Sequence, residues 1–368
     1  MKAINLVIHL HLAPILAHIP LFDIGRFPDY RNHDATKRLI QKVARQCIYP
    51  FTSLLRAMHN TYGNDFRFGL SMSGITIDLL VEYEPKALEA ISKMVISQEN
   101  IEMLGQSYSH GLSFMYQREA FIQQLQFQNK RLEDLFGQDP KVFVPTEGIY
   151  GNPMGFLMSH LNYKGIILRT LVPHVPWAKV HQPFHPMHVP ELALMMEDSG
   201  LSQSIKNASK DGLRLETVAN WIGEMEGGLV TICLDMLDFG FFQPSSSGLF
   251  DFFRNLPAYL LKLAEVKFAT PSECIELFPD RNQFNANQFL SKLGNTEAWN
   301  GNSLQQEALW KLHQLGLAIH TSNKDLQTNW LQLHCSDFFY AMRQKNEAYL
   351  DVYSNFLNIL ADLELRIG

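Results

Sequence analysis

Residues 4–11 read Ile-Asn-Leu-Val-Ile-His-Leu-His, a short apolar run rich in β-formers that ends in a histidine. Similar runs recur along the chain at Phe66–Met72, Ile101–Gly105, Val142–Pro145, Gly165–Leu168, Leu192–Met195, Leu229–Asp235 and Val266–Ala269. Helical patterns separate them, at residues 34–58, 75–97, 118–136, 215–225 and 249–263. Strands that alternate with helices predict a mostly parallel sheet. Seven or eight such units favour a closed or nearly closed barrel over an open sheet.

The pattern changes after about Phe278. A stretch rich in Asn and Gln follows, and residues 304–319, 325–344 and 347–365 then read as amphipathic helices. We therefore expect two domains, a barrel over residues 1–279 and a C-terminal helical domain over 280–368. Within the barrel, Asp34 is expected to cap its helix, and Gly137 to end another.

Composition limits the functional class. Only 18% of the 368 residues are charged, 11% are aromatic, and the net charge is −6. No basic block interleaves with aromatic residues, so a nucleic-acid partner is not expected. Four cysteines without a Cys-x-x-Cys pair are typical of a reduced cytosolic protein. The uncharged segment 3–22 loosely resembles a signal peptide, but histidines and prolines interrupt it, so we predict a soluble cytoplasmic protein with no membrane partner.

Polar residues at the carboxyl ends of three predicted strands are the first candidates for chemistry, because the active sites of β/α barrels lie there. His11 ends the first run, Glu147 follows the run at 142–145, and Asp235 ends the run at 229–235. Two carboxylates near a histidine suit acid/base or nucleophilic work on a glycosidic bond. Many strands also end in Asp or Glu simply because the loop beyond is solvated, so the pattern alone leaves that alternative open.

The amino-acid sequence of these segments resembles glycoside hydrolase family 57, the amylase and 4-α-glucanotransferase family, and the resemblance extends over most of the chain. Thr146-Glu147-Gly148-Ile149-Tyr150 is similar to the segment that carries the family's nucleophile, and Asp235-Met236-Leu237-Asp238-Phe239-Gly240 to the segment of its acid/base. The resemblance implies a (β/α)7-type distorted barrel followed by a C-terminal helical bundle. It also implies a retaining hydrolase or transglycosylase acting on α-glucans.

In that mechanism Glu147 attacks the anomeric carbon, and Asp235 donates a proton and later acts as a base. Asp235 needs a raised pKa, which we expect from the charge on Glu147 and from the apolar neighbours Leu237, Phe239 and Phe241. Further residues are predicted to contact the α-glucan or oligosaccharide: His11, Gln106, His110, Tyr150, Trp330 and Asp337. Trp177 and Trp299 are additional candidates for stacking on sugar rings, although core packing is an alternative for Trp330. No cofactor is expected, and the oligomeric state stays open.

Several positions depart from the family pattern. Apolar or neutral residues replace the usual polar ones, at Leu12, Gln106, Leu237, Phe242 and Phe338. A second hypothesis is therefore a catalytically impaired carbohydrate-binding or regulatory protein with the same barrel.

A third hypothesis comes from a Pro-rich stretch that contains His174, His181, His185 and His188. His185-x-x-His188 has the spacing of half a metal site, which would suit a metal-dependent carbohydrate hydrolase. No Cys or acidic partner lies nearby, so an extended loop over the barrel mouth is the alternative, and the predicted site contains no metal.

Overall fold

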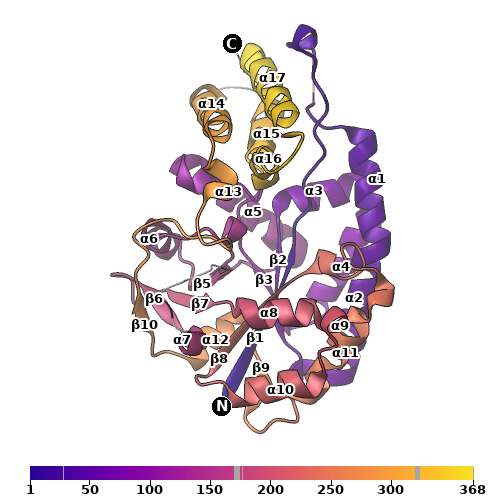
Figure 1. The fold of residues 1–368 in the computed structure, drawn as a ribbon, viewed down its shortest axis with the longest axis vertical. Helices are drawn as coiled ribbons and strands as arrows, with labels where there is room; N and C mark the ends of the chain where they lie inside the picture. Colours follow the sequence, from indigo (N-terminus) through magenta and orange to yellow (C-terminus); the bar gives the residue numbers. More distant parts are fainter. Residues whose placement is uncertain (28, 170–174, 176, 320–323, 368) are drawn as a thin grey trace.

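The computed structural model describes residues 1–27, 29–169, 175, 177–319 and 324–367. Seven parallel strands form a closed ring, and Figure 1 labels the strands in the lower half of the molecule. They are β1 (Lys2–Leu10), β2 (Phe68–Met72), β3 (Ile101–Leu104), β4 (Val142–Phe143), β5 (Gly165–Leu168), β7 (Ala193–Met196) and β8 (Leu229–Asp235). Ladders join β3-β2-β1-β8 and β7-β5-β4. Parallel bridges from Gly105 to Phe143 and from Glu197 to Thr231 close the ring. The predicted (β/α)7-type barrel is thus confirmed.

All eight predicted strands are present, and two short strands were not predicted. The predicted run at Val266–Ala269 forms β9 (Val266–Phe268), which pairs with the first residues of β1. Because β2 pairs with the last four residues of β1, β9 fills the part of this edge that β2 leaves open. The two strands that were not predicted are β6 (Phe184–Pro186) and β10 (Asn282–Phe284). β6 pairs with β7, and β10 pairs with β6. Each of these two strands has three residues and no apolar run, which explains why the sequence pattern did not reveal them.

Helices surround the ring, and most of them agree with the pattern. Pro85 begins a new helix within the predicted span 75–97, because its ring cannot continue the preceding one. Asn32, and not Asp34, caps α1, since its side chain accepts a hydrogen bond from the backbone N–H of Ala35. Gly137 ends α5 at a φ of 70°, as predicted. The barrel helices are α1 (His33–Val43), α2 (Tyr49–Tyr62), α3 (Gly74–Tyr83), α4 (Pro85–Ile96), α5 (Arg118–Phe136), α6 (Asn152–His160), α7 (Trp177–Val180), α8 (Ser199–Lys206), α9 (Ala208–Asp211), α10 (Leu215–Glu224), α11 (Leu249–Leu260) and α12 (Pro271–Leu277).

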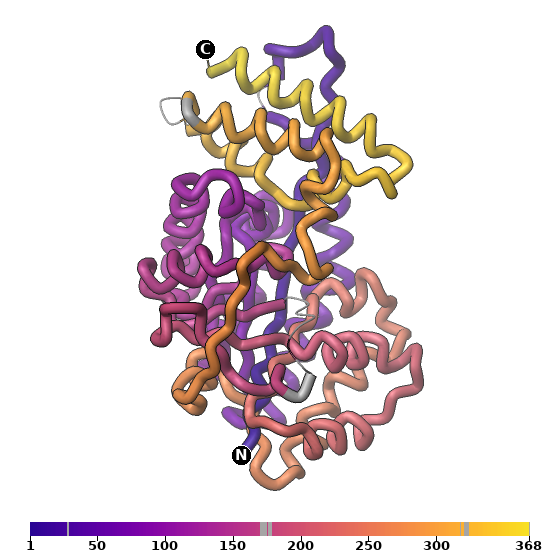
Figure 2. Tube along the Cα trace, turned by 60° about the vertical axis from the view of Figure 1, so that its left-hand side comes forward, coloured from indigo at the N-terminus to yellow at the C-terminus, as the bar shows by residue number. Residues whose placement is uncertain are grey.

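The C-terminal helices gather at one end of the barrel, and a long connection leads to them along its side (Figure 2). They are α13 (Glu297–Asn300), α14 (Ser303–Ile319), α15 (Lys324–Leu333), α16 (Ser336–Ala341) and α17 (Tyr349–Ile367). Their apolar core also includes Ile19 and Tyr30 from the loop after β1. The hydroxyl of Tyr30 donates to the buried Asp362 of α17 at 2.9 Å. The helical end is therefore built from both ends of the sequence, and the division at residues 279 and 280 stays a prediction.

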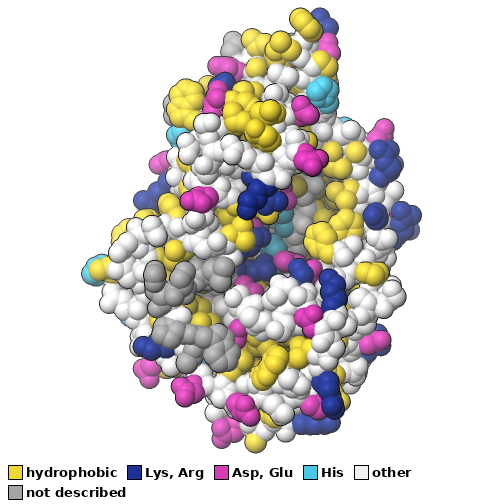
Figure 3. All heavy atoms as spheres, in the orientation of Figure 1, with side chains coloured by type: hydrophobic (Ala, Val, Ile, Leu, Met, Phe, Trp, Pro, Cys, Tyr) yellow, Lys and Arg dark blue, Asp and Glu magenta, His cyan; other side chains and the backbone are white. Residues whose placement is uncertain are grey.

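The loop after β3 is tied to the helical end. Gly111 and Cys335 form an antiparallel bridge, and the backbone N–H of Ser336 donates to the carbonyl of His110 at 3.1 Å. The face drawn in Figure 3 is hollowed near its middle, and acidic, basic and histidine side chains gather in that hollow. No helix in the described part of the chain has the length and apolar character needed to span a bilayer.

Candidate active site

Four charged residues stand at the carboxyl ends of the barrel strands. Glu147 follows β4, Arg169 follows β5, Glu197 follows β7, and Asp235 ends β8. His9 of β1 is in register with Asp235, so the imidazole and the carboxylate start from neighbouring points of the sheet. This edge is where β/α barrels build their active sites, because the loops that follow the strands converge there.

Glu147 is held in a fixed position. Its backbone has a φ of 55°, which is unusual for a residue with a side chain. Ser336 donates a hydrogen bond to Oε1 at 3.1 Å, and the ammonium group of Lys292 forms an ion pair with Oε2. A Cβ on the next residue, Gly148, would lie 2.3 Å from the carbonyl oxygen of Arg169, so glycine is required there. The turn therefore presses the Glu147 loop against the end of β5.

Asp235 lies in a different environment from the one we expected. Arg169 contacts both of its oxygens, with Nη1 3.1 Å from Oδ1 and Nη2 3.5 Å from Oδ2. Burial favours a higher pKa, but the positive charge of Arg169 outweighs it and, with His9, holds the pKa of Asp235 below its ordinary value. The prediction of a raised pKa is therefore wrong.

The apolar side chains that we expected around Asp235 pack against the barrel core instead. The Phe239 ring packs against Phe51 and Phe253 in the barrel core, with ring centroids 4.5 Å and 5.1 Å away. Leu237 and Phe241 pack against the same core. The aromatic residues that follow Asp235 thus stabilise the barrel, and the guanidinium group of Arg169 controls the carboxylate.

Glu197 shares Arg169 with Asp235. Its Oε2 lies 3.4 Å from Nε of Arg169, and only 9% of its side chain is exposed. Burial raises the pKa of Glu197, and the attraction of Arg169 only partly opposes this effect. One buried cation therefore lies between two carboxylates, one held ionised and one biased toward the protonated form.

Three histidines line the other side of the site. The rings of His11 and His110 stack with centroids 4.3 Å apart, and His9 lies 5.2 Å from His110. Burial lowers the pKa of His9 to about 3 and that of His110 well below its usual range, so both are neutral at pH 7. His110 also has a positive φ of 53°, and its Nε2 lies 3.8 Å from Oε1 of Glu147.

The start of α16 completes the site. Nε2 of His11 lies 3.0 Å from Oδ2 of Asp337, and Nδ1 of His11 lies 2.7 Å from the hydroxyl of Ser73. The thiol of Cys335 lies 3.3 Å from the same Asp337 oxygen and 3.5 Å from His11 Nε2. The side chain of Asp337 is half exposed. Partial desolvation of the carboxylate favours a higher pKa, but the hydrogen bond to His11 outweighs this effect and lowers the pKa of Asp337 to about 2.

Three of the residues predicted to contact substrate lie elsewhere. Gln106 is fully buried, and its Oε1 lies 3.1 Å from Nδ1 of His110, so it supports that ring. Tyr150 is buried, and its ring centroid lies 6.0 Å from that of Phe284. Trp330 is buried among the C-terminal helices, where its indole N–H donates to the carbonyl of Leu312.

The two remaining predicted tryptophans are Trp299 and Trp177. Trp299 is buried near Tyr340 in the helical core. The side chain of Trp177 lies outside the described residues. The structure thus brings Glu147, Asp235, His11, His110 and Asp337 together in one site.

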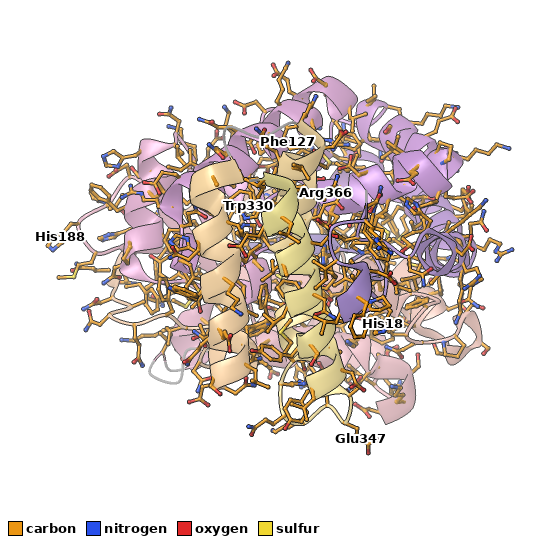
Figure 4. All side chains as sticks on the ribbon, turned by 90° about the horizontal axis from the view of Figure 1, so that it is seen from above. His18, Phe127, His188, Trp330, Glu347 and Arg366 are labelled. Atoms are coloured by element: carbon orange, nitrogen blue, oxygen red, sulfur yellow. The ribbon has the colours of Figure 1, made fainter. Side chains whose placement is uncertain are left out.

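The three described histidines of the Pro-rich stretch do not lie together. His181 is buried and pairs with Asp198 at 2.9 Å, and Nδ1 of His185 lies 2.8 Å from the carbonyl oxygen of Pro186. His188 is exposed, and Figure 4 shows it at the rim of the molecule, pointing outward. His174 lies outside the described residues. In the part that the structure describes, this stretch forms α7 and β6 and holds no cluster of three metal-ligand side chains.

Several site residues were not predicted. Arg169 directly follows the predicted strand at 165–168, and Glu197 lies two residues beyond the predicted strand at 192–195, so the strand-end rule that found Glu147 and Asp235 could have found them as well. His9 faces the site from within the first strand. Lys292 lies in the Asn-rich connection, and Cys335 begins no recognisable motif, so neither had a sequence signal.

A parallel barrel with two carboxylates at its strand ends suits the cleavage of a glycosidic bond. Residues 6–290 match the model described as glycosyl hydrolase family 57, and the chain belongs to that family. The "Putative alpha-amylase" of Methanocaldococcus jannaschii is 25% identical to this chain, and the match covers 92% of this chain and 79% of that protein.

Solved structures agree with the fold. The 4-alpha-glucanotransferase of Thermococcus litoralis superposes with a TM-score of 0.72 at 12% identity, over 97% of this chain and 60% of that one. The GH57 branching enzyme of Thermococcus kodakaraensis gives 0.73 at 10% identity, over 98% and 88%. At these identities the superpositions establish the fold alone.

Proposed function

We propose that this protein is a retaining glycoside hydrolase or transglycosylase that acts on α-glucans through a glycosyl-enzyme. Glu147 is the nucleophile, and Asp235 is the acid/base. Family membership and the names of the relatives, an amylase, a glucanotransferase and a branching enzyme, support this class of substrate. The chain spans only 60% of the glucanotransferase, so the choice between hydrolysis and transfer is itself part of the proposal.

The geometry of Glu147 is the observation that carries the proposal. A nucleophilic carboxylate must point at one position with little freedom, since misplacement raises the barrier. Ser336 and Lys292 occupy its two oxygens, the strained turn fixes its backbone, and only 11% of its side chain is exposed. The residue is therefore pre-positioned by elements from β4 and from the C-terminal half of the chain.

Asp235 must change its protonation state during the reaction. It gives a proton to the leaving oxygen, becomes a carboxylate, and then takes a proton from the water that attacks the glycosyl-enzyme. Arg169 favours the carboxylate and therefore the second step. For the first step the pKa of Asp235 has to rise when sugar binds, and Glu197 offers Arg169 a second negative partner on the other side.

The remaining polar groups are suited to hold a sugar. His11 and Asp337 form a hydrogen-bonded pair at the opening of the site, and His110 lies between His11 and Glu147. Neutral imidazoles donate and accept one hydrogen bond each, which suits hydroxyl groups. We assign these three residues to hydroxyls of the sugar that occupies the site.

A second candidate is the catalytically impaired carbohydrate-binding protein. The ion pair between Arg169 and Asp235 favours it, because a carboxylate held ionised is a poor proton donor at pH 7. Binding without turnover would be the expected behaviour in that case.

One experiment separates the two candidates. Purified protein is incubated with maltooligosaccharides and longer α-glucans, products are identified, and proton NMR records the anomer formed first. Turnover with retention of the α-configuration supports the enzyme, and inversion would reject the double displacement. Saturable binding by calorimetry without any product would favour the binding protein.

We also propose a cytoplasmic location. All four cysteines are buried free thiols, as expected in a reducing compartment. An α-glucan or oligosaccharide is the partner that the proposed chemistry requires, and the proposal includes neither nucleic acid nor membrane.

A further inference from the structure

Three potential metal ligands meet beside the proposed nucleophile. His11 comes from the end of β1, whereas Cys335 and Asp337 come from the start of α16, more than 300 residues later. Their ligand atoms, Nε2, Sγ and a carboxylate oxygen, all lie within 4.8 Å of one another. This is the one such group among the residues that the structure describes.

The separations fit a single small cation. Zinc binds sulfur at about 2.3 Å and nitrogen or oxygen at about 2.0–2.2 Å, so tetrahedral ligand atoms lie roughly 3.3–3.6 Å apart. The three observed separations are 3.5 Å between Sγ and Nε2, 3.3 Å between Sγ and Oδ2, and 3.0 Å between Nε2 and Oδ2. Movements of a few tenths of an ångström would bring all three atoms to zinc distances.

The surroundings orient the ligands. The hydroxyl of Ser73 lies 2.7 Å from Nδ1 of His11, and Thr76 lies 2.7 Å from that hydroxyl. Such a partner on the second ring nitrogen fixes the imidazole with Nε2 toward the cation. The bridge between Gly111 and Cys335 fixes the backbone of the thiol ligand. The side chain of His11 is 10% exposed and that of Asp337 50%, so the group opens toward the site on the Asp337 side.

We propose that His11, Cys335 and Asp337 form a binding site for a zinc-type divalent cation. A thiolate, an imidazole and a carboxylate match the donor preferences of Zn²⁺ and exclude Ca²⁺ and Mg²⁺, which take oxygen ligands. Three protein ligands leave the fourth tetrahedral position open for a water molecule or a hydroxyl group.

Occupancy has a consequence for the sugar site, and this consequence rests on the proposed function. The cation would take Nε2 of His11 and Oδ2 of Asp337, the atoms that we assign to sugar hydroxyls. Zinc and sugar would therefore compete for the same side chains, and bound zinc would inhibit glycoside cleavage.

The test uses the full chain after treatment with a chelator. Zinc is titrated by calorimetry, and Co²⁺ is added separately to record the absorption band that a cobalt–thiolate bond produces. We expect one ion per chain and a thiolate band in the wild type. Cys335→Ser should weaken zinc binding by on the order of 100-fold or more and remove the band.

Matched variants make the result specific. Cys274→Ser changes another buried free thiol and should leave both signals unchanged. Asp337→Asn alters a half-exposed side chain, so it tests the site even if Cys335→Ser does not fold. Neither measurement needs sugar, and Glu147→Gln should still bind zinc, so failure of the metal site and failure of the proposed function are distinguishable. Absence of stoichiometric binding, or an unchanged band in Cys335→Ser, would overturn the proposal.

Discussion

The two carboxylates of the site are both paired with cations, but in opposite structural ways. Glu147 meets Lys292, a half-exposed side chain from the connection between barrel and helices. Asp235 meets Arg169, a buried side chain at the end of a barrel strand that also contacts Glu197. The nucleophile thus has a partner on the surface, whereas the acid/base has a partner fixed in the protein interior.

Because of this difference, we expect proton donation by Asp235 to limit the rate of the reaction. Glu147 performs its role in the ionised form that a cation favours. Asp235 needs the proton that Arg169 disfavours, so its environment is suited to the second half of the double displacement. Substitutions at each carboxylate, and then at the residues that make their environments unequal, test this difference.

Glu147→Gln should give the largest effect. It removes the negative oxygen that attacks the anomeric carbon but keeps the shape and the hydrogen bond from Ser336. We expect kcat on an α-glucan to fall on the order of 10⁴-fold or more, with little change in melting temperature. A rate close to that of the wild type would exclude Glu147 as nucleophile.

Asp235→Asn should have a smaller effect that depends on the substrate. Loss of general acid catalysis costs roughly 10²–10⁴-fold where the leaving group needs a proton. An activated aryl α-glucoside needs little protonation, so formation of the glycosyl-enzyme from it should be nearly unaffected. Burst kinetics on both kinds of substrate would measure the contrast, and equal losses on both would argue against the acid role.

Arg169→Gln should shift the pH profile. With Arg169 present, the pKa of Asp235 lies below its usual value of 3.8, so the protonated fraction and kcat/KM start to fall in the acidic range, as the pH rises through that lowered pKa. Without the positive charge, the pKa rises, and this limb should move about 1–3 pH units toward alkaline pH. Arg281→Gln is the control, because Arg281 contacts backbone carbonyl groups and, among the described residues, no carboxylate. An unmoved limb in Arg169→Gln would contradict the assigned role of Asp235.

Gly148→Ala should separate backbone strain from close contact. Gly137 and Gly148 both have positive φ values, 70° and 66°, but only at Gly148 would a Cβ meet the carbonyl oxygen of Arg169. Gly137→Ala should cost about 1–2 kcal/mol of unfolding free energy, and Gly148→Ala about 1–3 kcal/mol more. Equal losses in chemical denaturation would show that the contact between the two strand ends contributes nothing.

The sequence was sufficient for the barrel and for part of the site. Long apolar strands such as β8 and the segment around Glu147 carry local signals, so their places could be predicted. The pairing of Asp235 with Arg169 could not, because it depends on which strand ends meet across a closed ring. Lys292 and Cys335 reach the site through the path of the connection and the packing of α16, which leave no trace in local sequence. For Trp330 the sequence leaves sugar stacking and core packing open, because a helical aromatic residue has the same local pattern whether it faces a ligand or a core.

Mass spectrometry of the glycosyl-enzyme tests the role of Glu147 most directly. Asp235→Asn is mixed with an activated fluorinated α-glucoside, digested and mapped, because loss of the base lets the covalent species accumulate. The double displacement predicts one added glycosyl unit on the peptide that contains Glu147, and none in Glu147→Gln. If the protein cleaves the substrate but carries no adduct, or carries the adduct on the peptide of Asp235 or Glu197, the role of Glu147 as nucleophile is contradicted.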